Sequence, residues 1–254
     1  MPSATSAQPS NPFIKQLASS NRTERDRALS SLRTYLHRTK SFTATDFLKL
    51  WKGLFYCMWM SDKPRNQQRL ARDLAELLDA VTSRANFLGF LEAFWTTMAR
   101  EWQVIDSLRM DKYLYLVRCY VNKGFEHVGR KDWGDEEFLE QYLEVMKSVP
   151  FNARDGKIPN GLRYHVIDIY VDELDKVDTK RNVPLEKVIK PLKQLGIDTP
   201  TKAVRSRVNE ALEDERLSDW QKVDKDEDES EDKEGSAQAN ESEGDDEEFG
   251  GFDD

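Results

Sequence analysis

One stretch of the chain constrains the fold more than any other: residues 50–64, which read LWKGLFYCMWMSDKP. Trp51, Phe55 and Trp59 recur every four residues, so a single helical stripe carries three large rings. The opposite side of the same helix is also largely apolar. A helix that is apolar around most of its circumference has to be buried on several sides. We therefore expect a central helix over residues 43–60 that ends at a Ser-Asp-Lys-Pro turn.

Apolar residues recur at helical spacing through most of the chain, and the two-residue alternation of strands is almost absent. Two consecutive units, 43–81 and 83–121, each span roughly forty residues, which is the length of a HEAT-type helix pair. Short polar breaks separate the helical patterns. The sequence therefore predicts an all-α protein, and we favour an irregular HEAT-like stack of about ten antiparallel helices over a closed bundle.

Charge divides the chain into two unlike parts. The formal net charge is −9, but residues 224–254 hold 16 acidic residues against two lysines, which is a net charge of −14. The remaining 31 acidic and 36 basic residues give residues 1–223 a net charge of +5. The acidic part cannot bury enough apolar area to fold. We expect a disordered lead at 1–10, an all-helical scaffold domain at 11–220 that allows a subdivision near 150–160, and a disordered acidic tail at 221–254.

The sequence also bears on where the protein works. No window of eighteen apolar residues occurs, so no membrane span is expected. The first twelve residues lack both the charged and the apolar regions of a secretory signal. Cys57 and Cys119 lie inside apolar helical patterns rather than in a CxxC pair. We expect both to be reduced core residues of an intracellular protein.

Catalytic constellations are sparse in this sequence. His165, Asp168 and Asp172 fall on one helix face and are the only group whose spacing suggests metal ligands. The solvated polar face of an amphipathic helix explains the same residues, and we favour that interpretation. No HExxH, GxSxG or P-loop motif occurs. We therefore expect no catalytic residues, no metal site, no cofactor and no small-molecule substrate.

Basic residues form clusters along the predicted helices. Contact with a phosphate backbone requires such clusters, because each neutralised phosphate releases counterions. An ordinary helix surface with mixed charges has the same appearance, so both interpretations stay open. The candidate contacts with RNA or a protein partner are Lys63, Arg65, Arg69, Arg72, Lys187, Lys190, Lys193 and Arg205. Of these, we expect the first four to form one contact surface.

Aromatic residues suggest two further surfaces. Tyr56 and Trp59 lie near the end of the central helix, so they are better placed for a partner than Trp51 and Phe55, which we expect in the core. In the tail, Phe249 and Phe252 are set among acidic residues. Aromatic side chains flanked by acidic residues are suited to docking on a basic groove of a protein.

Several runs together point to a family. The segment 50–64 is followed by QQRLARDLAELL and then by WxxIDxLRxDKYxxLxR at Trp102–Arg118, and NARDGKIPNGLRYHVIDIYVDEL follows at 152–174. From about Asn11 to Val177 the chain resembles the nucleolar ribosomal RNA processing protein one family, also called the fifty-two-kilodalton nucleolar protein family. The resemblance implies an all-helical scaffold of large-subunit ribosome precursors, located in the nucleolus within the nucleus. It also implies a factor that is needed for pre-ribosomal RNA processing without being a nuclease.

The resemblance has consequences for partners. It implies docking on other biogenesis proteins and on precursor rRNA, and it transfers no catalytic residues. Some relatives carry long basic C-terminal extensions, whereas this chain ends in acid soon after Trp220. Two alternatives stay open beside the scaffold. One is a nuclease or phosphoesterase that uses the acidic residues around His165, and the other is a chaperone for basic ribosomal proteins or histones that acts through the tail.

Overall fold

The chain folds into a series of helices joined by short loops. The computed structural model describes residues 12–17, 19–37 and 41–220. This part of the chain holds ten α-helices and two 3-10 helices, and none of them combines the length and the apolarity that crossing a bilayer requires. The elements are α1 (Pro12–Leu17), α2 (Arg22–Leu36), α3 (Ala44–Trp59), α4 (Pro64–Ala75), η1 (Glu76–Ala80), α5 (Arg84–Glu101), η2 (Trp102–Val104), α6 (Ser107–Val128), α7 (Glu136–Ser148), α8 (Asn160–Val177), α9 (Leu185–Asp198) and α10 (Lys202–Leu212).

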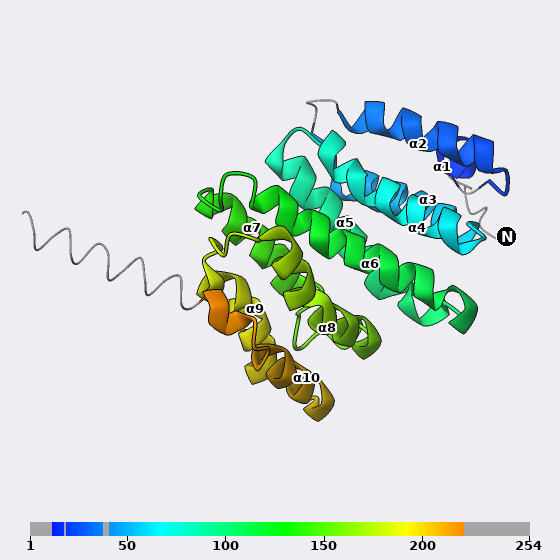
Figure 1. Cartoon of the computed structure of the whole chain (residues 1–254). Helices are drawn as coiled ribbons and strands as arrows, with labels where there is room; N and C mark the ends of the chain where they lie inside the picture. The colour runs from blue at the N-terminus through cyan, green and yellow to red at the C-terminus, as the bar shows by residue number, and fades with distance from the viewer. Residues whose placement is uncertain (1–11, 18, 38–40, 221–254) are drawn as a thin grey trace, which may run out of the picture.

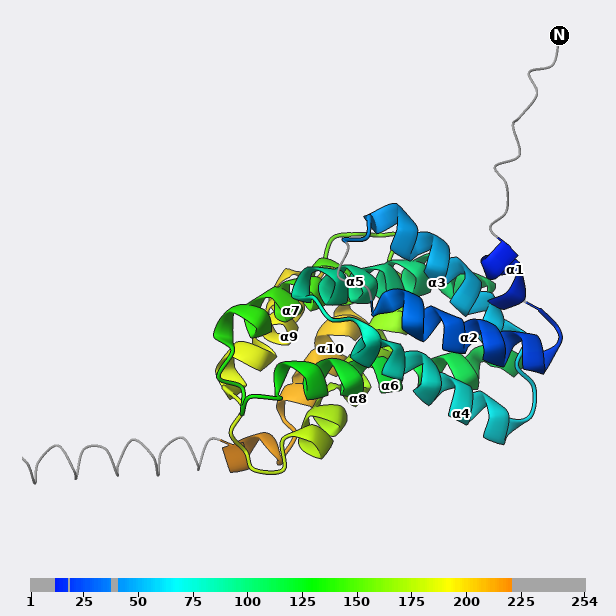
Figure 2. The ribbon, with the colours of Figure 1, turned by 90° about the horizontal axis from the view of Figure 1, so that it is seen from above.

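The helices alternate between two layers. In one layer α1 packs on α3, α3 on α5, α5 on α7 and α7 on α9; in the other α2 packs on η1, α4 on α6, α6 on α8 and α8 on α10. Figure 1 shows the helices following one another along the molecule, and Figure 2, seen from above, shows the two layers. No strand occurs among the described residues. The predicted all-α, HEAT-like stack is confirmed.

Helix α3 is the buried centre that its sequence predicts. Its first turn is closed by a capping box. The Thr43 side chain accepts the backbone N–H of Asp46, and the Asp46 side chain accepts the backbone N–H of Thr43. Trp51 and Phe55 are fully buried, and the indole Nε1 of Trp51 donates to the carbonyl of Phe90 on α5 at 3.0 Å. Trp59, the third ring of the stripe, is half-buried at the end of the helix. The core assignment of the stripe is therefore confirmed for its first two rings.

One expected helix is divided by the structure. Leu70, Leu74, Leu77, Leu78 and Val81 recur at a spacing that is typical of one continuous helix, but α4 ends at Ala75 and η1 follows. The hydroxyl of Tyr120 on α6 donates to the Leu74 carbonyl at 2.6 Å, and the N–H of Glu76 also bonds to that carbonyl. The 3-10 helix η1 thus begins next to a carbonyl that also accepts a bond from another helix.

The loop 149–159 between α7 and α8 is packed rather than loose. Phe151 and Ile158 are buried in the hydrophobic cluster that also contains residues of α6 and α8. Arg163 on α8 is buried beneath the loop, and its guanidinium donates to the carbonyls of Asn152, Asp155 and Ile158. One side chain thus organises most of the loop. The subdivision near 150–160 stays a prediction, and the predicted segments 1–10 and 221–254 lie outside the described residues.

Neither cysteine forms a disulfide among the described residues. Cys57 is buried, and desolvation raises the pKa of its thiol to about 12. Cys119 is half-buried, and desolvation raises its thiol pKa to about 11. The core placement is confirmed for Cys57, whereas Cys119 lies at the margin of the core. Both thiols are protonated at neutral pH and therefore poor nucleophiles.

Candidate interaction surfaces

The turn between α3 and α4 is fixed by bonds from outside it. Lys112, a buried residue of α6, donates from Nζ to the carbonyls of Trp59 and Ser61 at 2.8 Å each. Gln67 donates to the same Ser61 carbonyl at 3.1 Å. Burial, with a further contribution from the neighbouring Arg109, lowers the pKa of Lys112 to about 8. The ammonium therefore satisfies carbonyls left open at the end of α3 and in the turn, and Lys63 is exposed just after them.

The four basic residues expected to form one contact surface lie at the start of α4 and along it, and they differ in their partners. The contact surface itself stays a prediction. Lys63, Arg65, Arg69 and Arg72 are all exposed at the start of α4 or along it. Arg69 lies 3.9 Å from both Asp26 and Asp73, and Arg72 donates to the Tyr115 hydroxyl at 3.0 Å. Among the described residues, Lys63 and Arg65 have no carboxylate partner. Of the four, the two residues with neither a carboxylate nor a hydroxyl partner in the described part of the chain therefore lie at the N-terminal end of α4.

The second predicted set lies elsewhere. Lys187 pairs with Glu136 of α7 at 2.9 Å and Lys193 pairs with Glu186 at 2.6 Å, whereas Arg205 on α10 donates to the Thr199 carbonyl. Lys190 is exposed on α9. Lysines of α9 also line a groove of about 620 Å³ against α7. Because α9 and α10 close one end of the stack and α4 lies towards the other, the structure does not join the two basic sets.

Sequence reasoning missed an apolar ridge beside the basic end of α4. Leu108 is 91% exposed at the start of α6, Val104 is 60% exposed in η2 and Met60 is 40% exposed at the end of α3. The three lie at the turns α3–α4 and α5–α6, which occupy the same edge of the stack in Figure 1. The sequence does not distinguish Leu108 from a core residue, because Ile105 and Met110 in the same run IDSLRMDK are apolar as well. We call Met60, Val104 and Leu108 the apolar ridge.

Tyr56 and Trp59, the two rings expected on a partner surface near this turn, differ in exposure, and the partner surface stays a prediction. Tyr56 is 41% exposed one helical turn before Met60. The half-buried Trp59 carries the guanidinium of Arg109 over its ring, 4.5 Å from the centroid. The guanidinium therefore covers one face of the Trp59 ring next to the ridge.

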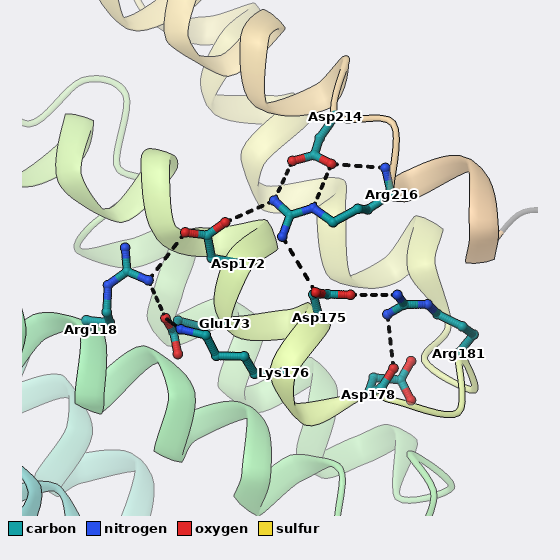
Figure 3. A network of polar contacts seen from close by, with 9 residues as sticks. All are labelled: Arg118, Asp172, Glu173, Asp175, Lys176, Asp178, Arg181, Asp214 and Arg216. Atoms are coloured by element: carbon teal, nitrogen blue, oxygen red, sulfur yellow. Dashed lines mark hydrogen bonds and ion pairs between the residues drawn. The ribbon is translucent and has the colours of Figure 1, made fainter.

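The residues weighed as metal ligands have other partners. His165 Nε2 lies 2.8 Å from the Leu114 carbonyl, and Asp168 pairs with Arg207 of α10. Figure 3 shows Asp172 between Arg118 and Arg216, at 3.3 and 2.9 Å. These two guanidinium groups lower the pKa of Asp172. In the part of the chain that the structure describes, no three His, Cys, Asp or Glu side chains form a metal-binding group.

Asp178, also drawn in Figure 3, is a buried carboxylate near the end of the stack. Asp178, at the end of α8, accepts the indole N–H of Trp133 at 3.3 Å and that of Trp220 at 2.6 Å. Backbone N–H groups of Asn182 and Val183 donate to its two oxygens as well. Three segments that are distant in sequence therefore meet at one side chain, close to where the described part of the chain ends.

A cavity of about 320 Å³ lies between the turns α4–α5 and α6–α7. Its apolar walls are Val81, Phe87, Val128 and Phe138, and we call it the Phe87 pocket. His127 also lines it, stacked on Phe87 with ring centroids 4.6 Å apart, and its Nε2 lies 2.9 Å from Asp79. Burial, followed by the nearby Arg130 guanidinium, lowers the pKa of His127 from 6.5 to about 4.

The His127 pKa predicts how stability depends on pH. Between pH 6.5 and about 4 the unfolded chain binds a proton at this residue and the folded chain does not. The free energy of unfolding should therefore fall as pH falls through that window, by up to about 1.4 kcal/mol for each pH unit. Denaturant titrations from pH 7 to 5 should show a smaller fall for His127→Gln. The half-buried His165 stays in both proteins, and substitution of the exposed His37 by Gln serves as control. Equal slopes for the wild type and His127→Gln would contradict the prediction.

Comparisons with known proteins give the wider context. The family model described as nucleolar protein Nop52 matches residues 8–250. Ribosomal RNA processing protein 1 homolog B of Homo sapiens is 44% identical over 174 residues, which cover 66% of this chain and 23% of the human protein. Homolog A of Mus musculus is 41% identical over 170 residues, 65% of this chain and 34% of the mouse protein. The Dictyostelium discoideum homolog is 28% identical over 216 residues, 78% of this chain and 43% of that protein.

The matched part of the chain thus corresponds to less than half of the length of each of these relatives. The family match is far more complete, because it begins at residue 8 and extends to residue 250 of 254. The resemblance derived from the sequence motifs is confirmed, and the chain belongs to the nucleolar protein Nop52 family.

Proposed function

We propose that this chain is a non-catalytic assembly factor of nucleolar large-subunit (pre-60S) ribosome precursors. It is needed for pre-rRNA processing because it scaffolds other biogenesis proteins and contacts precursor rRNA. The relatives are named for ribosomal RNA processing, and this supports a role of the chain in that process. The observation that carries the scaffold role is the apolar ridge at the edge of a helical stack.

The ridge supports protein docking for an energetic reason. Leu108 and Val104 are among the most exposed large apolar side chains in the described part of the chain, and they lie on neighbouring elements. Covering apolar surface stabilises a complex by roughly 25 cal/mol per Å². The exposed Tyr56 and the Arg109-covered face of Trp59 extend this surface with residue types that are enriched at protein interfaces. The basic end of α4 adjoins it through the α3–α4 turn, so one edge can contact protein and RNA together.

The experiment is affinity purification of the tagged full chain from the nucleolus. We expect it to recover large-subunit precursors, and we expect Leu108→Glu to reduce that recovery severalfold because it places a charge in the covered interface. Ile197→Glu is the matched control, since Ile197 is 75% exposed but lies at the other end of the stack, beside α10. If Leu108→Glu recovered as much precursor as the wild type, the apolar ridge would not be the docking surface. If the wild type recovered no precursors, the proposed function would be wrong.

RNA contact is assigned to the basic end of α4, and purified protein tests it. Lys63→Glu with Arg65→Glu should weaken binding to a precursor rRNA fragment and lower the slope of log affinity against log salt by about 1 for each phosphate that is no longer neutralised. The triple change of Lys187, Lys190 and Lys193 to Glu on α9 is the comparison. If the α9 variant binds the fragment more weakly than the α4 variant, the assignment to α4 is wrong.

The charge of the tail favours a second candidate. A segment with a net charge of −14 over residues 224–254 can shield basic ribosomal proteins or histones. Under this alternative, deleting the tail abolishes binding to basic proteins while purification through the apolar ridge is unchanged. Retained binding of basic proteins after the deletion would exclude the chaperone.

A further inference from the structure

We propose that the tail of this chain docks on its own body, with a phenylalanine of the segment 245–254 seated in the Phe87 pocket. This segment reads DDEEFGGFDD, so Phe249 and Phe252 are each flanked by carboxylates. The lining of the pocket combines the apolar residues Val81, Phe87, Val128 and Phe138 with polar and charged ones, and its volume of about 320 Å³ is at the lower end of the range of small ligand pockets. An aromatic side chain within an acidic peptide matches this chemistry.

The rim of the pocket supplies the complementary charge. Its lining contains the three cations Arg84, Arg130 and Lys131 against one carboxylate, Asp135. Asp135 forms ion pairs with both Arg84 and Lys131, the latter at 3.2 Å. Its side chain also caps α7 by accepting the backbone N–H of Phe138. One carboxylate therefore offsets two cations, and an acidic segment adds the charge that is missing.

The ion pairs around the rim are shared or exposed. Arg130 pairs with Asp79, which also binds Lys123 at 3.0 Å and lies against His127, and Lys123 has a second partner in Glu126 at 2.7 Å. Glu137 is 3.8 Å from Arg84 and mostly exposed, where ion pairs contribute little. Carboxylates of the tail can therefore compete for Arg84, Arg130 and Lys131 without breaking a buried pair.

The larger groove of the molecule does not share this selectivity. It lies between α7 and α9, and its lining carries three lysines and three carboxylates. Its charged residues are Lys147, Lys187, Lys190, Glu140, Glu144 and Asp198. A surface with balanced charges offers no net attraction to a polyanion. Of these two, the Phe87 pocket is the one with a positive excess.

Position favours the same site. The described part of the chain ends at Trp220, which shares the carboxylate of Asp178 with Trp133. Lys131 and Asp135 each lie two residues from Trp133, so the tail starts close to the rim of the pocket. Figure 1 shows the α4–α5 turn, the α6–α7 turn and the end of the described chain along one edge of the stack.

The length of the tail is sufficient. Phe249 follows Trp220 by 29 residues (249 minus 220), and a flexible chain of that length spans about 30 Å. A tether of this kind gives an effective concentration in the millimolar range, so a weak contact is populated. Because the pocket lies at the α4–α5 and α6–α7 turns, docking there leaves the apolar ridge on the opposite edge uncovered.

A spin label on the tail of the full chain tests the contact. Gly251→Cys can be labelled selectively, since burial raises the pKa of both native thiols, Cys57 and Cys119. We expect paramagnetic broadening of backbone NMR signals to concentrate on residues 81–87 and 127–138. Adding Phe249→Ala and Phe252→Ala should reduce the broadening there severalfold, and high salt should reduce it as well. Gln238→Ala, within the same tail but outside the docking segment, should leave it unchanged.

The pocket side is tested by Arg130→Glu with Lys131→Glu, which should lower the broadening as the phenylalanine changes do. The phenylalanine variants keep the test decisive if this pair disturbs the fold, because their changes lie outside the helical body. Broadening centred on the α7–α9 groove, or none that depends on Phe249 and Phe252, overturns the proposal. Broadening of isotope-labelled chains without a spin label, when mixed with spin-labelled chains, would show docking between two copies and overturns it too.

Discussion

Trp51→Ala should lower the free energy of unfolding by about 3–5 kcal/mol, which is the range for deleting a large buried aromatic side chain. The ring of Trp51 lies 5.3, 4.9 and 5.1 Å from those of Phe90, Phe94 and Tyr120, measured between centroids. Its contacts therefore join α3 to α5 in one layer and to α6 in the other. The substitution leaves a cavity at the junction of the layers and removes the donor to the Phe90 carbonyl. Denaturant titration followed by circular dichroism measures the loss.

Trp59→Ala is the matched control for this prediction. It removes the same side chain from the same helix, but Trp59 is half-buried and its main polar contact is the guanidinium of Arg109. The area returned to water is smaller, so the loss should be well below that of Trp51→Ala. A loss for Trp59→Ala equal to or above that for Trp51→Ala would contradict the assignment of Trp51 to the centre of the core.

Comparison of these two residues shows how far the sequence could predict the fold. Periodicity within one helix separates its buried from its exposed side, and for α3 it was sufficient because the apolar stripe is strong and Thr43 marks the first turn. The same reasoning failed at Leu74, whose carbonyl is taken by a hydroxyl from another helix. A pattern within a helix carries no information about a donor that arrives from 46 residues away.

The candidate surfaces were predictable to a similar degree. Clustering of Lys63, Arg65, Arg69 and Arg72 followed from their numbers alone, but only the fold shows that Asp26 of α2 lies near Arg69. The apolar ridge was not predicted, because Leu108 fits the apolar spacing of a helix and its exposure depends on which neighbours α6 has at its start. Sequence spacing thus locates charges, whereas packing between helices decides which of them stay available.

Asp178→Ala should lower the free energy of unfolding by at least about 3 kcal/mol. The carboxylate is buried and accepts two indole and two backbone N–H groups, from Trp133, Trp220, Asn182 and Val183. Each buried donor that is left without an acceptor costs about 1–3 kcal/mol. Because Trp220 is also fully buried, its release should shift tryptophan fluorescence to longer wavelength. Chemical denaturation and the emission spectrum of the folded state measure the two effects.

Two further substitutions separate the hydrogen-bond role of Asp178 from a general effect of charge. Asp178→Asn keeps one acceptor oxygen but turns an N–H₂ group towards donors, so its loss should lie between those of the wild type and Asp178→Ala. Asp132→Asn removes the charge of a nearby carboxylate whose pair with Lys180 is exposed, in a backbone conformation with a φ of 47° that Asn tolerates, and it should change the free energy of unfolding by less than about 1 kcal/mol. If Asp178→Ala costs no more than Asp132→Asn, the four donors find other acceptors. Trp220 would then be held by packing and by the Arg181 guanidinium 4.0 Å above its ring, rather than by the carboxylate.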